Sequence, residues 1–508
     1  MKLFNNTIII CLFSVALTVE CYAQSVKDKP NVLLILVDDL KPAIHGYGDQ
    51  TAITPHIDEL INNGVKFDRA YSNQAVCVAS RNNLLLGSRS TSTGIYDFGR
   101  DIRQYYPEVV TLPQAFKNQG YFTQAIGKVF HVGHNTYNDT LSWSVPHFHE
   151  KIIEYKTMDK SESDMTIESA LFENYSWEYA MKQIKGLPWE SPDVPDEAYG
   201  DGRVASKAIQ VLDSLNNQDE PFFLAVGFAR PHLPFSVPKK YWDLYEEDDL
   251  PLPITEEHPQ GAPDFAVKRF GEIEQYQHIP KYEENKRYPD SLKRKLIHGY
   301  YAGVSYVDQQ IGKVLAELNR TGLDSNTIVI LWGDHGYLLG DMGMWTKHVN
   351  YEKANRIPLV ISAPGNALKG HATKSIVETV DIYPTLMQLA SLKLPQNNPV
   401  PLDGESLVPL LTDKKHKVDY AYHCYPREGW MGRAIRTDEY RLVEWTNIKN
   451  KSLAPQYEFY QYDKDLLEYK NIADQTGEAF KNTLNILKKQ PAYHAQLPAS
   501  PPRPHREH

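Results

Sequence analysis

The chain has 508 residues, of which 23% are charged and 42% hydrophobic, a composition typical of a globular protein and unlike that of a disordered or fibrous one. A chain of this length is expected to form one large domain and a smaller one. Its formal net charge of −10 argues against broad nucleic-acid binding, but it leaves room for a local basic pocket that binds an anion.

The first 23 residues have the pattern of a secretory signal peptide. Lys2 precedes the apolar run TIIICLFSVALTV (residues 7–19), and Ala23 offers a cleavage point. The run is too short for a membrane span. The alternative is a lipoprotein in which Cys21 carries the lipid, and Glu20 disfavours that processing. We therefore expect a periplasmic or secreted protein that does not associate with a membrane.

Three apolar runs that end abruptly in polar residues predict strands of a mainly parallel sheet. They are NVLLILVDDL from residue 31, PFFLAVGFARPH from residue 221 and NTIVILWGDHG from residue 326. Continuous aliphatic and β-branched runs are typical of strands that are covered on both faces. Because ligands bind beyond the carboxyl ends of such strands, we expect the polar tips to converge.

Helical segments lie between these runs. TPHIDELINNG has Thr54 as the N-cap, Pro55 at the first helical position and Gly64 as a stop. Apolar residues at helical spacing predict a long helix over about residues 293–320, and SRNNLLLGS predicts a short helix directly after Cys77. The alternation of strands and helices predicts an α/β sandwich.

The pattern changes in the second half of the chain. Residues 150–200 and 250–289 are rich in Pro, Tyr and charge, and we expect them to be long excursions that shape a substrate pocket. After residue 411, short strand-like pieces and a helix near residues 477–489 predict a small subdomain with an antiparallel sheet. The expected divisions are a signal peptide (1–23), an N-terminal catalytic domain (28–411), a C-terminal subdomain (412–490) and a disordered tail (491–508).

Acidic residues at the ends of two expected strands have the character of a divalent-metal site. Asp38 and Asp39 follow the first strand, and Asp334 and His335 follow the last. Carboxylates that crowd together repel one another unless a cation neutralises them. Oxygen ligands favour Ca²⁺ or Mg²⁺ over zinc, although the imidazole leaves zinc open. A single Asp after a strand is often only a helix cap, and it is the repetition of the arrangement that favours the metal.

Cys77 lies close to Arg81 at the start of the expected short helix, where backbone N–H groups and the helix dipole attract an anion. Two simpler interpretations remain open. Cys77 could be a buried, unreactive thiol, or it could form a disulfide with Cys424, the other cysteine left after removal of the signal peptide. We expect Cys424 to be structural.

These residues resemble the signatures of the sulfatase family. The family hallmark is Cys or Ser, any residue, Pro or Ala, any residue, Arg, and residues 77–81 read CVASR. GYFTQAIGKVFH (residues 120–131) resembles the second signature, and the resemblance extends to the Asp-Asp, Asp-His-Gly and QYDKDLLEYKNIA motifs, over nearly the whole mature chain. It implies an alkaline-phosphatase-like α/β sandwich, with a large mainly parallel sheet flanked by helices and a smaller C-terminal α+β subdomain.

Within that family the chain looks most like iduronate-2-sulfatases. The resemblance rests on STGIYDFGRDIR, GKVFHVG, LSWSVPHFH, FFLAVGFARPHLPF and GMWTKHVNYE. Two departures stand out. Ala79 replaces the Pro of animal enzymes, as in bacterial members, and GDMGMW replaces a more usual Gly-Glu-His-Gly run beside the substrate pocket. The second departure leaves the identity of the sugar open.

The resemblance implies that Cys77 is oxidised during export to formylglycine (3-oxoalanine), by a formylglycine-generating enzyme or an anaerobic sulfatase-maturing enzyme. The aldehyde hydrate has two hydroxyls: one binds the metal and attacks sulfur, and the other later loses a proton and expels sulfate. The resemblance also implies one Ca²⁺ per chain. The implied ligands are Asp38, Asp39, Cys77, Asp334 and His335.

The same resemblance assigns the other catalytic roles. Arg81, Lys128 and Lys347 would hold the sulfate oxygens. His131 would be the base of the second step, and His232 would protonate the leaving alkoxide. Weaker candidates for contact with the sugar are Asp139 and Trp143.

The expected function is that of an exported sulfatase that acts on a uronate-containing sulfated polysaccharide or its oligosaccharides. Candidates are iduronate 2-sulfate in glycosaminoglycans and an algal glycan of the ulvan type. One alternative is a phosphatase or phosphonate hydrolase of the same superfamily, although such relatives often use two metals and the ligands here suffice for one. Another is a glycan-binding protein that has lost turnover.

Overall fold

The structure is a computed structural model that describes residues 29–159, 165–268, 271–281, 287–365, 368–462, 467–475 and 477–501. The expected signal peptide and residues 502–508 of the expected tail lie outside these ranges. Among the described residues, no helix combines the length and the apolar character that a membrane crossing requires.

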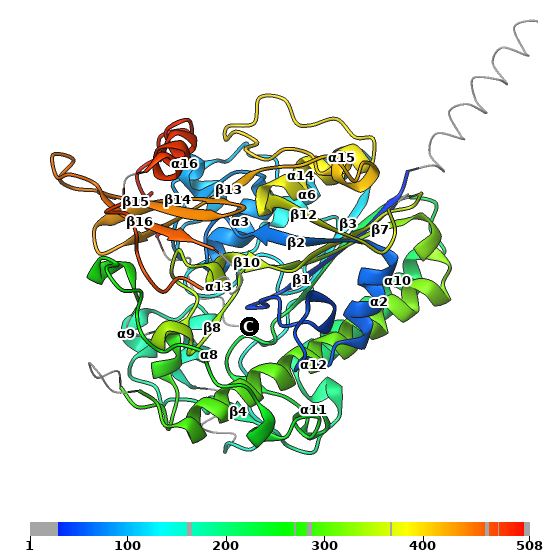
Figure 1. The fold of residues 1–508 in the computed structure, drawn as a ribbon. Coiled ribbons are helices and arrows are strands. Elements are labelled where there is room, and N and C mark those ends of the chain that lie inside the picture. The colour runs from blue at the N-terminus through cyan, green and yellow to red at the C-terminus, as the bar shows by residue number, and fades with distance from the viewer. Residues whose placement is uncertain are drawn as a thin grey trace, which may run out of the picture.

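A large mixed sheet forms the centre of the molecule (Figure 1). Its strands, in spatial order, are β10 (Arg356–Ile357), β2 (Val65–Tyr71), β11 (Leu359–Ser362), β7 (Thr327–Gly333), β1 (Asn31–Val37), β5 (Phe222–Phe228) and β3 (Phe122–Gly127), and β12 (His371–Glu378) also pairs with β2. The pairs β1–β5, β1–β7, β3–β5 and β12–β2 are parallel, whereas β11 runs antiparallel to β7 and to β2. The three predicted strands are therefore the neighbours β7, β1 and β5, and the mainly parallel sheet is confirmed.

Helices cover both faces of this sheet because successive side chains of a strand point to opposite sides. Alternate residues of β1, beginning with Leu33, belong to the core cluster that includes helices α2, α10 and α12, and those beginning with Val32 belong to the cluster that includes α3, α6 and α14. Figure 1 shows the two groups of helices on either side of the sheet. Their bounds are α2 (Pro55–Asn63), α10 (Gly200–Leu215), α12 (Asp290–Arg320), α3 (Cys77–Leu86), α6 (Leu112–Lys117) and α14 (Ile382–Leu389).

Helix α2 begins at Pro55 as expected, but Thr54 does not cap it through its side chain. The Thr54 hydroxyl instead accepts a hydrogen bond from the backbone N–H of His45 at 3.0 Å. The backbone N–H of Ile57, in the first turn of the helix, donates to the carboxylate of Asp308 at 2.8 Å. Asp308 lies on the neighbouring helix α12. A tertiary contact thus replaces the local cap.

A smaller antiparallel sheet follows, as predicted for the C-terminal part. Its strands are β13 (Tyr420–Arg427), β14 (Trp430–Thr437), β15 (Tyr440–Asn447) and β16 (Gln456–Gln461), and helix α16 (Glu478–Lys488) packs on them. The expected boundary at residue 411 falls inside a short helix, α15 (Val408–Thr412). Other short elements are α4 (Ser90–Thr93), α5 (Ile102–Tyr105), α11 (Lys239–Trp242), α13 (Glu352–Asn355), β4 (Trp189–Glu190), β6 (Phe235–Ser236), β8 (Leu338–Leu339) and β9 (Trp345–Thr346).

Residues 491–501 differ from the disordered tail that the sequence predicted. They run along residues 91–105, and the backbone N–H groups of His494, Leu497 and Ser500 donate to backbone carbonyls there at 2.7–2.9 Å. The segment has no helical or strand pattern of its own, so its position depends on these distant partners.

Candidate active site

Polar residues converge at the carboxyl ends of neighbouring strands, as the sequence predicted. Asp38 and Asp39 follow β1, His232 lies beyond β5, and Asp334 and His335 follow β7. The backbone fixes the tips to one another, because the N–H of Asp38 donates to the carbonyl of Phe228 at 3.2 Å and the N–H of Asp334 donates to that of Val37 at 3.1 Å. These hydrogen bonds continue the ladder of the sheet past the strands and hold the acidic residues together.

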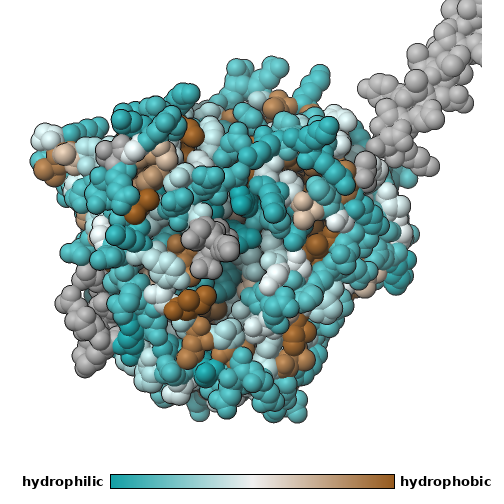
Figure 2. Space-filling model, viewed as in Figure 1, coloured by the Kyte–Doolittle hydropathy of each residue, from teal (hydrophilic) through white to brown (hydrophobic). Residues whose placement is uncertain are grey.

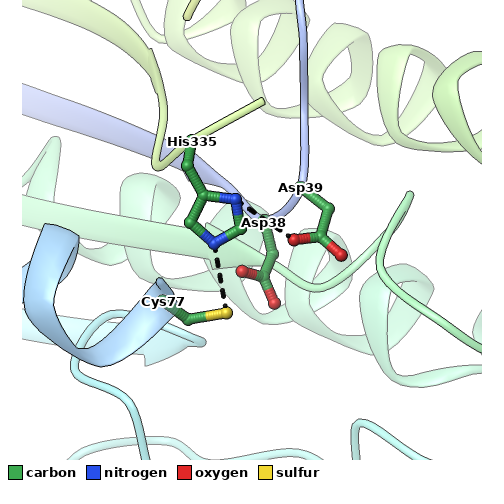
Figure 3. Close-up of side chains that lie close together, drawn as sticks. All are labelled: Asp38, Asp39, Cys77 and His335. Carbon is green, nitrogen blue, oxygen red and sulfur yellow. Dashed lines mark hydrogen bonds and ion pairs between the residues drawn. The ribbon is translucent and has the colours of Figure 1, made fainter. Parts of the chain in front are cut away.

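Four buried side chains form a group of the composition that a metal ion needs. Asp38, Asp39, Cys77 and His335 can each place one ligand atom within 4.8 Å of the others (Figure 3). His335 Nε2 lies 3.3 Å from Cys77 Sγ, and His335 Nδ1 lies 3.4 Å from Asp39 Oδ1. The Oδ1 atoms of Asp38 and Asp39 are buried and accept no hydrogen bond from the described residues. Buried carboxylate oxygens without a donor fit a hard cation.

Asp334 is held differently from the other implied ligands. Its Oδ1 atom accepts hydrogen bonds from the backbone N–H groups of Asp39, at 3.0 Å, and His335, at 2.9 Å. Its Oδ2 atom accepts one from Arg81 Nε at 3.1 Å. The structure therefore places Asp334 beside the group, with both oxygens already engaged.

Three buried cations face these carboxylates. Arg81 is fully buried, bonds to Asp334 and lies 3.4 Å from Asp38. Lys128, directly after β3, contacts the other oxygen of Asp38. Lys347 donates to Asp39 Oδ2 at 3.0 Å and to Glu272 Oε2 at 3.1 Å. The sequence thus identified three cations that the structure brings to one place; the further carboxylate, Glu272, belongs to no motif.

The charges in this group do not balance. There are four carboxyl groups, those of Asp38, Asp39, Asp334 and Glu272, and three cations, Arg81, Lys128 and Lys347. Burial and the negative charge of Asp38 raise the pKa of Asp334 well above its usual value. Burial opposes ionisation of Asp38 too, but Lys128, His232 and Arg81 hold its pKa well below the usual range. The site therefore has an excess of negative charge that either a proton or a metal cation would relieve.

Cys77 is the first residue of α3 and is 1% exposed. Burial, followed by the negative charge of Asp38, raises the pKa of its thiol well above the usual value. A neutral thiol is a poor nucleophile and a poor ligand. Cys77 and Cys424 are both free in the structure, so a disulfide between them is wrong. Cys424 packs instead with Tyr96 and Met431.

Histidines border the group on the side of the cavity. His131 Nε2 lies 3.2 Å from His134 Nδ1, and His131 Nδ1 is buried without a hydrogen-bond partner among the described residues. The Nδ1 atom of His232 lies 2.5 Å from the carbonyl of Leu233, and its Nε2 atom lies 3.6 Å from Glu272. Burial lowers the pKa of His232 to about 4 and that of His131 well below its usual value. Both imidazoles are neutral in this state.

A cavity of about 1200 Å³ lies over Cys77. The expected excursions do line it: the first contributes side chains from α8 (Ile167–Phe172) and α9 (Trp177–Ala180), and the second contributes Lys268 and Glu272. The other lining residues include Asp97, Phe98, His131, His134, His232, Lys347 and His348. Figure 2 shows a mostly hydrophilic surface on the face in view, with hydrophobic side chains scattered over it.

The structure does not bring Asp139 and Trp143 to this cavity. Asp139 pairs with Arg103 through two hydrogen bonds of 2.9 and 2.7 Å and accepts another from Ser142 at 2.6 Å. Trp143 is buried against Phe130. Both side chains are thus occupied by partners inside the fold.

Several residues that line the cavity are not among the site residues predicted from the sequence. His134 follows His131 by three positions, and this spacing is the only signal that points to it. Glu168 lies on α8 and is buried, and burial raises its pKa well above the usual value. Glu272 and Lys268 come from a segment without periodicity or motif, so no local pattern indicates them.

Comparison with known proteins gives consistent matches along the chain. The family model named Sulfatase matches residues 30–392, and the model named N-sulphoglucosamine sulphohydrolase, C-terminal, matches residues 340–492. Iduronate 2-sulfatase of Homo sapiens is 31% identical in an alignment 540 residues long, which covers 92% of this chain and 96% of that protein. An ulvan-active sulfatase of Formosa agariphila is 28% identical, with 92% and 85% covered.

The fold also matches solved structures. One of them is a protein in complex with its substrate, D-glucosamine-2-N,6-O-disulfate. It aligns with a TM-score of 0.68 at 20% sequence identity, over 91% of this chain and 97% of that one. At this identity the match establishes the architecture, an α/β sandwich with a C-terminal antiparallel sheet.

Proposed function

The chain belongs to the sulfatase family and is a sulfuric ester hydrolase, and from this premise we propose that it removes sulfate from a uronate-containing sulfated polysaccharide or its oligosaccharides. Relatives named iduronate 2-sulfatase and ulvan-active sulfatase support this class of substrate. The cavity over Cys77 has room for more than one sugar-sized group.

The charge of the buried group is the observation that carries the proposal. When all four carboxyl groups are ionised, the group has one negative charge in excess and would repel a sulfate ester. A single divalent cation held by Asp38, Asp39 and His335 would turn the excess positive, and the site would then attract the anionic ester. We propose that this ion is Ca²⁺, one per chain, because oxygen ligands predominate.

The proposed ion would lower the pKa of a hydroxyl group carried by residue 77. Asp334 is a further proposed ligand. The two N–H donors of Asp39 and His335 fill the two acceptor positions of Oδ1, whereas Oδ2 accepts one hydrogen bond from Arg81 Nε and has a second position to offer to the ion. The same N–H groups would keep its carboxylate oriented toward the other ligands.

We propose that Cys77 is converted to formylglycine by a maturing enzyme of the formylglycine-generating or the anaerobic kind. The raised pKa of the buried thiol supports this proposal, because a neutral thiol at this position would have little reactivity of its own. An aldehyde hydrate carries the two hydroxyl groups that attack and release of sulfate require, whereas Ser or Cys carries a single group.

The surrounding residues suit the remaining steps. Lys128 and Lys347 are each paired with an aspartate, and a cation bound to those aspartates would free both amines to hold sulfate oxygens together with Arg81. His131 has an unpartnered ring nitrogen and can take the proton from the second hydroxyl group of residue 77. With its Nδ1–H donated to Leu233, His232 would present Nε2 to the leaving oxygen, and the negative charge of the bound ester would raise its pKa so that Nε2 carries the proton to be given.

The proposal is tested by mass spectrometry of the peptide that contains residue 77, combined with assays on defined sulfated oligosaccharides. Protein co-expressed with a maturing enzyme should carry an aldehyde at Cys77 and release sulfate. Cys77→Ser should bind substrate but turn it over very slowly, while Cys424→Ala, which removes the other buried thiol, should stay active. Full activity with an intact thiol at residue 77 would show that the mechanism is wrong.

Export and selectivity for sulfate esters are tested separately. We propose export with cleavage after Ala23, which N-terminal sequencing of the mature protein would show by a first residue of Gln24. Selective hydrolysis of sulfate esters over phosphate and phosphonate esters separates the proposed activity from that of a phosphatase of the same fold. A protein that binds sulfated glycans without releasing sulfate would match the other alternative, a glycan-binding protein that has lost turnover.

A further inference from the structure

Two basic side chains next to the active-site cavity have no carboxylate partner among the described residues. Lys268 lines the cavity, and its Nζ atom contacts Nδ1 of His348, which is not an anion. Arg427 donates from Nη2 to the backbone carbonyl of His348. Its Nε atom and Nε2 of His348 are buried and lack a hydrogen-bond partner in the described part of the chain.

This arrangement is unlike that of Arg441 and Arg81, two other buried cations of the protein. Arg441 bonds to Glu352 at 2.8 Å and to Glu468 at 2.6 Å, and Arg81 bonds to Asp334 at 3.1 Å. Buried charges are normally paired in this way because desolvation is costly. An unpaired basic cluster that borders a cavity is therefore a place where an anion from outside would replace the missing partner.

The electrostatic surroundings of the cluster point the same way. Burial, with the positive charges of Arg427 and Lys347, lowers the pKa of Lys268 to about 7. Glu272 and Asp97 act in the opposite direction, but Glu272 already bonds to Lys347. A bound anion would stabilise the charged form of Lys268 and satisfy donors that now have no acceptor.

The cluster is also rigidly supported and close to the reacting group. His348 stacks on Tyr425, with ring centroids 5.9 Å apart and planes at 25°, and the guanidinium of Arg427 lies 5.2 Å from the same ring. His348 directly follows Lys347, which bonds to Asp39 in the catalytic group. Adjacent residues of one segment thus reach the buried catalytic group and the basic cluster.

We propose that Lys268 and His348, with Arg427 behind them, form a subsite for a second anionic group of the substrate, separate from the sulfate that is released. The group is a carboxylate or another sulfate. This inference rests on the proposed function, since a sulfated uronate glycan carries both kinds of anion. It assigns substrate selection to Lys268 and Arg427, which lie outside the quoted motifs, and to His348, which follows Lys347 in GMWTKHVNYE.

The test compares three saccharides with the same scissile sulfate. One carries a uronate carboxylate, the second has that carboxylate reduced to an alcohol, and the third is the reduced form with an additional sulfate. The measured quantity is kcat/KM for each saccharide, and the preference is the ratio of an anionic saccharide to the reduced one. Wild-type enzyme should prefer at least one of the two anionic saccharides over the reduced one.

Lys268→Met should lower this preference by about 10- to 100-fold, because one charge-assisted contact is lost. Lys268→Arg should retain most of it, since the charge remains. Lys182→Met is the matched control: Lys182 is exposed, pairs with Glu178 beside α9 and does not line the cavity, so the protein loses the same charge. The control should keep the wild-type preference.

The outcome identifies the anion. A loss of preference confined to the uronate saccharide assigns a carboxylate, and a loss confined to the doubly sulfated one assigns a sulfate. An equal fall in kcat/KM on all three saccharides, or no change in preference, would overturn the subsite. As a separate readout, Lys268→Met should not lower the Tm, because it removes an unpaired, partly buried charge; a clear fall in Tm would indicate a structural lysine.

Failure of the proposed function would look different. Wild-type enzyme would then desulfate none of the three saccharides, whatever its preference for anions. In that case the subsite is tested by inhibition of 4-nitrophenyl sulfate hydrolysis with glucuronate, and with glucose as the neutral comparison. Inhibition by glucuronate that weakens about 10-fold in Lys268→Met supports the subsite, and equal inhibition of both enzymes overturns it.

Discussion

Arg81 is the residue whose removal tests the electrostatic account of the site most directly. Its side chain is fully buried, and its Nε atom bonds to Asp334 at 3.1 Å. Its Nη1 atom donates to the backbone carbonyls of Lys128 and Val129. Arg81→Met keeps much of the volume but removes the charge and every donor. Asp38 and Asp334 then remain buried with less compensation, and the negative excess of the group doubles.

The expected loss of stability is large. Removing one partner of a buried ion pair typically costs about 3–5 kcal/mol, because the remaining charge stays desolvated. With about 1.4 kcal/mol per factor of ten, the ratio of folded to unfolded protein should fall by roughly two to three and a half orders of magnitude. Globular proteins are stable by only about 5–15 kcal/mol, so the change is readily measured.

The assay is thermal and urea unfolding, each with Ca²⁺ in excess and with a chelator. A cation that binds only the folded state stabilises it by about 2.7 kcal/mol at 100 times its Kd. Because Arg81→Met makes the group more negative, the difference between the calcium and chelator conditions should be larger in the variant than in the wild type. Sulfate release should fall in both conditions.

Arg103→Met is the control for the loss of a partly buried arginine. Arg103 forms two hydrogen bonds with Asp139, outside the cavity over Cys77. The Arg103→Met variant should be less stable than the wild type, but the chelator should lower the stability of both proteins by the same amount. If Arg81→Met unfolds at the wild-type midpoint, or if the chelator affects it no more than the control, the charge account of the site is wrong.

Two further predictions concern the leaving group and the backbone. His232→Ala should lower kcat/KM by about 10²- to 10⁴-fold for sugar sulfates and by much less for activated aryl sulfates, whose leaving oxygen needs no proton; equal losses would remove His232 from the acid role. Gly227→Ala would place a Cβ atom 2.0 Å from the backbone oxygen of Lys128, so it should cost about 1–3 kcal/mol of stability and reduce activity. Gly477→Ala, where the nearest atom would be 3.9 Å away, is the comparison, and a similar Tm for both variants would contradict the steric argument.

The sequence by itself determined the centre of the fold and the positions of its acidic tips. Strands β1, β5 and β7 are continuous apolar runs, and such runs can be satisfied only in a sheet covered on both faces. The polar residues after them converge because parallel strands end at one edge. The helix after Cys77 was also predictable, since its signals are local.

Only the tertiary structure decided which side chains meet across long stretches of chain. The cap of α2 by Asp308, the pair of Asp139 with Arg103 and the course of residues 491–501 join distant segments. The cluster of Lys268, His348 and Arg427 arises from three segments, and although His348 lies in a quoted motif, nothing in the sequence indicates that the three side chains meet. Periodicity reports which face of an element is buried, whereas the partner that each buried polar group finds depends on how the elements pack.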